Sequence, residues 1–118
     1  MAPFTFKKSE RLTGKKTIER LFADGGSFFI FPFKVFYIPN SEAPHNRILF
    51  SVPKRNFKKA TDRNLIKRRS KEIYRLNKFS NKDGKKFDVI FVFVGKEILS
   101  YSSIEKKLLQ ALQRFSEI

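Results

Sequence analysis

The residues with the clearest chemical meaning in this sequence are basic and lie close together. Ten lysines and arginines occur within the 22 residues from Lys54 to Arg75, and only Asp62 and Glu72 oppose them. Ten minus two gives the segment a net charge of +8, which is more than half of the chain's formal +15. Such a cluster predicts a surface that binds the phosphates of a polyanion. Its basic residues are Lys54, Arg55, Lys58, Lys59, Arg63, Lys67, Arg68, Arg69, Lys71 and Arg75.

Part of this segment has helical spacing. Arg63, Lys67, Lys71 and Arg75 follow one another at i, i+4, so on a helix they form one ladder, with Asn64 beside it. The other face carries apolar residues that can pack on a sheet: Leu65, Ile66, Ile73 and Leu76. Like charges at this spacing each cost roughly 0.2–0.5 kcal/mol, and a helix built only for stability would alternate Glu with Lys. We interpret the ladder as a face for phosphates; the alternative is an ordinary solvated helix surface.

Residues for catalysis by the protein itself are few. A protein nuclease needs its own acid and base, or its own metal cluster. The chain has no cysteine, and its single histidine, His45, follows Pro44 in an expected loop. The carboxylates form no tight motif, and Gly25-Gly26 lacks the Gly-Lys-Ser/Thr ending of a phosphate-binding loop. We therefore predict no catalytic residue and no metal site in the protein.

Length and composition predict one globular domain that spans residues 1–118. About 41% of the residues are hydrophobic, and fifteen phenylalanines supply much of a core. The excess of positive charge repels itself in the folded state, and a polyanion relieves that repulsion. Nucleic acid is the usual polyanion for such a domain, and an anionic membrane surface is the rival.

The same composition bears on the cellular compartment. The absence of cysteine fits a reducing compartment, and charges at Lys7, Lys8, Glu10 and Arg11 leave no apolar stretch for a signal peptide. The longest apolar run, residues 28–38, is too short to cross a bilayer. We expect a cytoplasmic protein.

The first half of the chain predicts an arm, a helix and two strands. Residues 1–12, with Pro3, Phe4 and Phe6, read as an extended arm that can add a short strand. Residues 15–23 read as a short helix that ends at Gly25-Gly26. Residues 28–38 read as one strand with a bend or an edge at Pro32, and residues 47–52 as the next. The two strands are close enough in sequence for an antiparallel hairpin.

The second half predicts two helices around a buried strand. Thr61 or Asp62 can cap a helix that runs to about Asn77. Residues 87–94 are nearly all apolar, which is typical of a central strand covered on both faces. Ser102 and Glu105 have the spacing of a capping box, and an apolar stripe follows them: Ile104, Leu108, Leu112 and Phe115.

The order α-β-β-α-β-α, with the possible extra N-terminal strand, predicts the α+β class. A sheet packed with helices buries the apolar face of every element. We expect a single-domain α-β sandwich in which three helices pack on a central mixed sheet.

The basic helix also resembles a family signature. The run from Arg63 to Arg68, followed by Lys71-Glu72 and Arg75, is similar to the pattern Arg-Asn-Arg-x-Lys-Arg-x-x-Arg-Glu-x-x-Arg of bacterial ribonuclease P proteins. Leu65 stands at the family's second Arg and Lys71 at a later one. The resemblance extends along almost the whole chain. Its other parts are Phe6, Arg11-Leu12, Phe22 and Gly25 near the N-terminus, Phe50 to Arg55, Asp88 to Val94, and the closing amphipathic helix.

This resemblance implies a function and a fold. It implies that an RNA is the catalyst and that the protein is its accessory subunit, with no further protein partner and no membrane. The ribonucleoprotein removes the 5′ leader of precursor tRNA, using Mg²⁺ bound chiefly by the RNA. The family fold contains a left-handed βαβ crossover, like the second domain of a small-subunit ribosomal protein, although right-handed crossovers prevail in about 98% of cases.

The resemblance also assigns binding residues. It implies that a cleft between the first helix and the sheet holds the single-stranded leader, at Phe22, Phe36 and the non-aromatic Ile18. It implies that the basic helix and its preceding loop contact the catalytic RNA. The expected RNA-binding residues are Lys54, Arg55, Lys58, Lys59, Arg63, Asn64, Lys67, Arg68, Lys71 and Arg75.

Three other functions compete with this one. A structural RNA-binding protein of the ribosomal type fits the charge and composition equally well, and stimulation of RNA cleavage separates the two. Binding of double-stranded DNA is less favoured, because no helix-turn-helix or paired dimer element is visible. Attachment to a membrane surface is also less favoured, because the basic helix lacks the bulky aromatic face of an interfacial helix.

Overall fold

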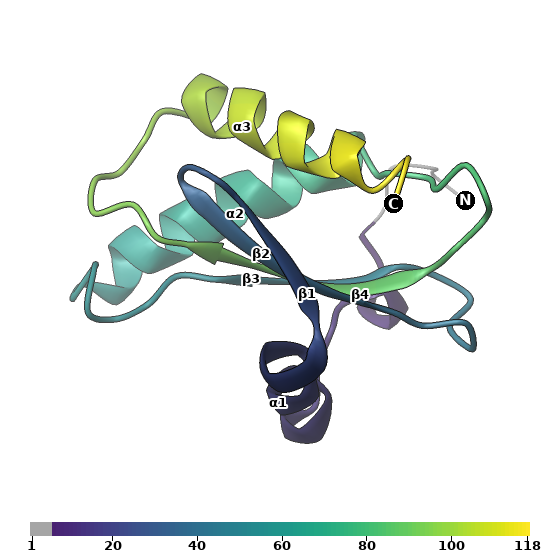
Figure 1. Ribbon diagram of the computed structural model, residues 1–118. Coiled ribbons are helices and arrows are strands. Elements are labelled where there is room, and N and C mark those ends of the chain that lie inside the picture. The colour runs from purple at the N-terminus through teal and green to yellow at the C-terminus, as the bar shows by residue number, and fades with distance from the viewer. Residues whose placement is uncertain (1–5) are drawn as a thin grey trace.

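A four-stranded sheet divides the molecule into two unequal layers (Figure 1). The computed structural model describes residues 6–118. After a 3-10 turn at Lys8–Glu10, the elements are α1 (Lys15–Asp24), β1 (Gly26–Ile30), β2 (Phe33–Pro39), β3 (Arg47–Ser51), α2 (Ala60–Leu76), β4 (Phe87–Phe93) and α3 (Tyr101–Arg114). The helices α2 and α3 cover one face of the sheet, drawn above it, and α1 lies against the other (Figure 1).

The sheet is mixed, and its strands lie in the order β1-β2-β4-β3. The pairs β1–β2 and β2–β4 are antiparallel, whereas β3 and β4 are parallel. Because α2 connects the two parallel strands, β3, α2 and β4 form the βαβ unit that the family resemblance implies. The predicted α+β class, with three helices on a mixed sheet, is confirmed.

The predicted hairpin is wrong, and the sheet has one strand more than the sequence indicated. Residues 28–38 do not form one strand, because the chain turns at Phe31-Pro32 and returns as β2. Proline has no N–H for a ladder hydrogen bond, and here its carbonyl accepts one from the Val94 N–H at 2.7 Å. The hairpin is therefore β1–β2, and β3 pairs with β4 instead of with β2.

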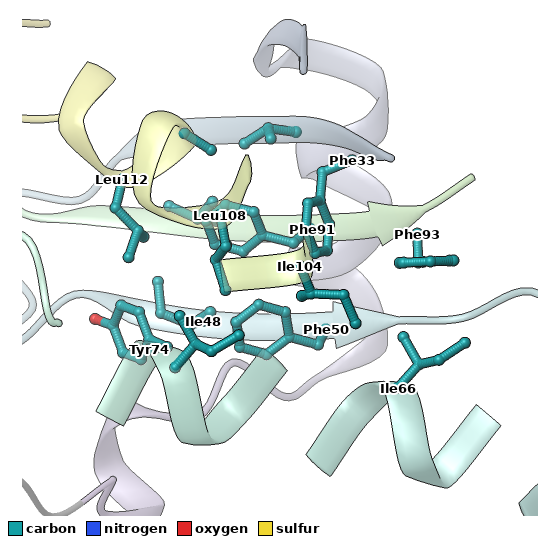
Figure 2. Packing of buried hydrophobic residues seen from close by; sticks show 14 of the residues in the cluster. Phe33, Ile48, Phe50, Ile66, Tyr74, Phe91, Phe93, Ile104, Leu108 and Leu112 are labelled. Carbon is teal, nitrogen blue, oxygen red and sulfur yellow. The ribbon is translucent and has the colours of Figure 1, made fainter. Parts of the chain in front are cut away.

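The central strand is β4, as predicted, and both of its faces are covered. Six of its seven residues are buried. On the α2 and α3 side, Phe91 stacks on Phe50 at 5.1 Å between ring centroids. Figure 2 shows side chains of both helices around this aromatic pair. The main core includes Phe33, Ile48, Phe50, Ile66, Tyr74, Phe91, Phe93, Ile104, Leu108 and Leu112.

The α1 side holds a smaller apolar cluster. Leu21 of α1 and Leu12 of the arm are fully buried against Ile90 of β4. Partly buried residues complete the cluster: Ile18, Ile38, Leu49 and Val92. The sheet therefore presents a thick core on one face and a thin, partly open apolar layer on the other.

The basic helix α2 packs through a narrower face than the sequence indicated. Ile66 and Ile73 are buried as predicted, but Leu65 is only half-buried and Leu76 is 42% exposed. Tyr74, which precedes the last residue of the basic ladder, also lies in the core. The apolar contact surface of α2 is thus centred on Ile66, Ile73 and Tyr74.

The start of α2 and the position of Arg69 also differ from expectation. Lys59 precedes the helix without a side-chain cap, and Thr61 and Asp62 lie inside its first turn, so the predicted cap is wrong. Arg69, which falls within the predicted apolar stripe, donates a hydrogen bond from Nη1 to the Leu99 carbonyl at 2.7 Å. This bond connects α2 to the loop before α3.

The N-terminal arm is less extended than predicted. Pro3 and Phe4 lie outside the described residues. The described part turns at Lys8–Glu10 and then forms one parallel bridge, between Arg11 and Ile48. The possible extra strand is therefore reduced to a single bridge beside β3. Along residues 6–118, no helix combines the length and the apolar character needed to span a bilayer.

The cap of α3 lies two residues earlier than predicted. Ser100, not Ser102, precedes the helix, and its Oγ accepts a hydrogen bond from the Ser103 N–H at 3.2 Å. Ser102 is an exposed residue of the first turn. The Ser102 Oγ lies 3.4 Å from the Ser100 Oγ, but the backbone N–H of the first turn donates to Ser100.

We expect Ser100→Ala to lower the free energy of unfolding by about 1 kcal/mol, because the first turn loses its side-chain acceptor. Urea unfolding followed by circular dichroism measures the change. Ser102→Ala is the matched control and should have a much smaller effect. Equal losses in both variants would contradict the cap seen here.

Candidate nucleic-acid interface

The exposed face of α2 carries the predicted basic ladder, but its four members differ in their contacts. Lys71 is exposed and Lys67 is half-buried, and Arg68 and Asn64 are exposed beside them. Arg63 and Arg75 instead contact groups of the protein. The two middle residues of the ladder, Lys67 and Lys71, are therefore accessible to a ligand. The two end residues, Arg63 and Arg75, also form contacts within the protein.

Arg63 fixes the basic loop that precedes α2. Its Nη1 donates hydrogen bonds to the carbonyls of Phe57 at 2.7 Å and of Lys58 at 2.9 Å. Phe57 is buried, and its ring lies 5.9 Å from that of Phe93. These contacts anchor the loop from both sides, so Arg63 positions it in addition to contributing charge.

The loop displays the remaining predicted cations at the N-terminal end of α2. Lys54, Arg55, Lys58 and Lys59 are all exposed. The N-terminus of a helix has a partial positive charge, so cations there are unfavourable for the isolated protein. An anionic partner at this end of the helix offsets that cost.

A groove of about 650 Å³ runs between α2 and the N-terminal arm. It brings together five of the predicted residues, Asn64, Lys67, Arg68, Lys71 and Arg75, with Phe6, Arg11 and Glu72. Glu72 is the one acidic residue among the described residues of its lining, and Arg75 neutralises it through an ion pair of 2.6 Å. The groove is therefore strongly positive. The four loop cations lie outside its lining.

The arm holds Arg11 across the groove from α2. Phe6 packs edge-on against Tyr74 at 5.4 Å, and Glu10 pairs with Lys78 at 2.8 Å. The Arg11 guanidinium lies 5.4 Å from the centroid of the Phe6 ring. Sequence reasoning did not select Arg11 as a binding residue, because the contacts that place it join segments far apart in the chain.

The charges in the groove shift the pKa values of two neighbouring side chains. The pKa of Lys71 is lowered, first because its side chain is partly desolvated and then by the positive charges of Arg11 and Lys67. The pKa of Glu72 is lowered by its hydrogen bond from Arg75. Repulsion among the cations of the groove and neutralisation of its carboxylate both favour an anion as the ligand.

The residues predicted to bind the leader lie on the α1 face of the sheet. Phe22 of α1 and Phe36 of β2 meet at 4.8 Å between ring centroids, with an angle of 68° between their planes. Phe22 is 49% exposed and Phe36 is half-buried. Ile18, one turn before Phe22, packs against the small apolar cluster. The structure thus brings the two aromatic residues together at the surface. Ile18 is instead partly buried in the small apolar cluster.

The acidic residues are dispersed within the part of the chain that the structure describes. There, no three Asp, Glu, His or Cys side chains come together as a metal site would require. His45 is an exposed loop residue.

The chain matches one family model, described as Ribonuclease P, over residues 6–116. Among curated proteins, the ribonuclease P protein component of Porphyromonas gingivalis is 33% identical over 98% of this chain and 89% of its own length. That of Petrotoga mobilis is 38% identical over 93% of this chain and 94% of its own length.

Solved structures show the same fold. The ribonuclease P protein of Thermotoga maritima matches with a TM-score of 0.76 and 29% identity, over 89% of this chain and 96% of that one. The Staphylococcus aureus protein matches with a TM-score of 0.76 over 91% of this chain and 94% of that one, at 24% identity.

The open middle of the ladder predicts a specific salt effect. We expect Lys67→Ala to weaken RNA binding and to reduce the slope of log affinity against log salt by roughly one unit, because one phosphate contact is lost. Filter binding over a range of salt concentrations measures the slope. Lys106→Ala, an exposed lysine of α3, is the matched control and should keep the slope. An unchanged slope in Lys67→Ala would exclude the ladder from the interface.

The lowered pKa of Lys71 predicts a response to Arg11. We expect Arg11→Ala to raise the pKa of Lys71 toward the ordinary lysine value, because one of the charges that disfavour the ammonium is gone. RNA binding should raise it as well, since phosphates favour the protonated form. Side-chain NMR titration measures both shifts. Arg114→Ala on α3 is the control, and an equal effect there would contradict the groove geometry.

Proposed function

The chain belongs to the bacterial ribonuclease P protein family, and we propose that it binds the catalytic RNA through α2 and the precursor tRNA leader through the α1 face of the sheet. As a protein component of ribonuclease P, it takes part in the processing of tRNA 5′ ends, and its partner is the ribonuclease P RNA.

The positive groove is the single observation that supports the RNA contact most strongly. Within residues 6–118, the ion pair on α2 joins Arg75 to Glu72 and leaves Lys67, Arg68 and Lys71 for an external anion. Arg11 adds a cation from the opposite wall. The loop cations extend this surface past the N-terminus of α2, so that an RNA backbone can follow the helix along its length. The proposed contacts are Arg11, Lys54, Arg55, Lys58, Lys59, Arg63, Asn64, Lys67, Arg68, Lys71 and Arg75.

The aromatic pair supports the leader contact. Single-stranded nucleic acid binds to aromatic side chains beside positive charge, and each stacked base contributes roughly 1–3 kcal/mol. Phe22 and Phe36 offer such a platform, and Lys34 lies over the Phe36 ring at 5.8 Å. A leader has no counterpart in mature tRNA, so this site distinguishes the precursor from the product. We assign Ile18 an apolar contact at the base of the platform.

We further propose that the groups that catalyse hydrolysis belong to the RNA. In this assignment the RNA also holds most of the Mg²⁺, and the protein contributes affinity and orientation. Water attacks the phosphodiester bond that joins the leader to the tRNA, and the product carries the mature 5′ end. We place this activity in the cytoplasm, with no further protein partner.

The proposal predicts stimulation of RNA-based cleavage. We expect the protein to increase multiple-turnover removal of the leader by its cognate ribonuclease P RNA at low Mg²⁺, because its cations replace part of the counterion charge. The variant Lys67→Ala/Lys71→Ala should need a higher protein concentration for the same rate. The rate of release of a labelled leader measures both. The matched control, Lys106→Ala/Lys107→Ala on α3, should behave like the unchanged protein.

Two results would contradict the proposal. Tight RNA binding without any stimulation would favour a structural RNA-binding role of the ribosomal type. Mg²⁺-dependent cleavage by highly purified protein in the absence of RNA would show that the catalytic groups belong to the chain.

A further inference from the structure

A transverse row of side chains crosses the α1 face of the sheet next to Phe36. Strand pairing places Phe29 of β1 opposite Lys34 of β2, Lys34 opposite Val92 of β4, and Val92 opposite Ser51 of β3. Side chains directly opposite one another point to the same face, and so do residues two apart on one strand. Phe29 and Lys34 therefore lie on the same side of the sheet as Phe36.

Aromatic exposure is concentrated at the β1 end of this row. Phe29 and Phe31 are each 54% exposed and Phe22 is 49% exposed, more than any other large apolar side chain among residues 6–118. Phe31, in the hairpin turn, lies 6.4 Å from Phe29 between ring centroids, at 73°. Clustered exposed aromatic rings mark an interaction surface more often than isolated ones do.

A lysine lies between the two aromatic sites. Lys34 is opposite Phe29 in the β1–β2 register and two residues before Phe36 on the same strand. Its ammonium lies 5.8 Å from the Phe36 ring centroid, and its flexible stem allows it to exchange that ring for a phosphate oxygen. Phe29 and Phe36 are diagonal neighbours, which in a sheet means a separation of roughly 7–8 Å.

We propose that Phe29, supported by Phe31, is a second base-stacking site and that Lys34 binds the phosphate between it and the Phe22–Phe36 site. The ligand is single-stranded RNA: the part of the precursor tRNA leader beyond the nucleotides at Phe36. This inference rests on the proposed leader contact, and it extends that contact to the outer edge of the sheet. The affinity for the precursor therefore depends on the length of the leader as well as on its presence.

Charge favours RNA over a second copy of the chain as the occupant. The chain has a formal net charge of +15, and Lys34 lies in the middle of the row, so two copies would bring like charges together. An RNA strand brings both a phosphate for Lys34 and bases for the rings. The surface is also continuous with the aromatic pair at Phe22 and Phe36.

The test uses the holoenzyme, assembled from this protein and its cognate ribonuclease P RNA. Its affinity is measured, under conditions that prevent cleavage, for precursor tRNAs whose leaders are lengthened one nucleotide at a time. We expect Phe29→Ala to bind short-leader precursors like the unchanged protein and to bind long-leader precursors about tenfold more weakly, which corresponds to the loss of one stacked base. Phe36→Ala should lose affinity for both. Lys34→Gln should lower the salt slope by roughly one unit for long leaders only.

Leu109→Ala is the matched control, because Leu109 is an exposed apolar residue of α3, on the other side of the sheet. Thermal unfolding confirms that each variant is folded. Identical affinities of Phe29→Ala and the unchanged protein at every leader length would overturn the second site while leaving the leader contact intact. If no leader increased the affinity of the unchanged protein, the proposed leader contact would fail as well. Sedimentation showing a dimer that Phe29→Ala dissociates, with leader binding unaltered, would assign the surface to a second copy instead.

Discussion

The packing of α2 against the sheet is the contact on which the rest of the structure depends. Its like charges at i, i+4 oppose helix formation by roughly 0.2–0.5 kcal/mol per pair. Burial of a large apolar side chain contributes about 1.5–3 kcal/mol, and Ile66, Ile73 and Tyr74 of α2 are all buried. The core therefore outweighs the repulsion, and the helix can present closely spaced cations without carboxylates between most of them. Because α2 also connects β3 to β4, the same contact closes the parallel half of the sheet.

The two faces of the sheet have different physical roles. The face under α2 and α3 contains almost all the fully buried aromatic residues, in edge-to-face and stacked pairs such as Phe50 with Phe91. On the α1 face, the fully buried members of the cluster among residues 6–118 are Leu12, Leu21 and Ile90. A short helix covers part of that face and leaves aromatic rings in solvent. Stability is thus concentrated on one side, and the other side retains apolar surface for a ligand.

Local patterns in the sequence predicted most helices and strands. Where the observed structure differs from the one expected from the sequence, contacts between distant parts of the chain account for most of the difference. The 3.6-residue period predicted α2 and its ladder, and a continuous apolar run predicted β4. The β1–β2 turn was missed because phenylalanines continue on both sides of Pro32, so nothing in the hydrophobic pattern marks the reversal. Arg11 lies opposite α2 because Phe6 packs on Tyr74 and Glu10 pairs with Lys78, and both contacts join segments far apart in the chain. Spacing along a helix cannot show either of them, and this is why the groove was only half predicted.

The neighbouring residues Phe28 and Phe29 of β1 point to opposite faces of the sheet. Phe28 lies 5.6 Å from Phe115, with the Arg114 guanidinium 4.5 Å from its ring, whereas Phe29 points to the α1 side. Since side chains alternate with a period of two, a shift of one residue in the hairpin would exchange the two rings. Because both side chains are phenylalanine, burial of apolar surface does not favour one register over the other. The geometry of the turn must therefore set the register. Evolution can therefore vary the composition of this hairpin far more freely than its length, because an insertion or deletion of one residue would alter the core and the ligand face together.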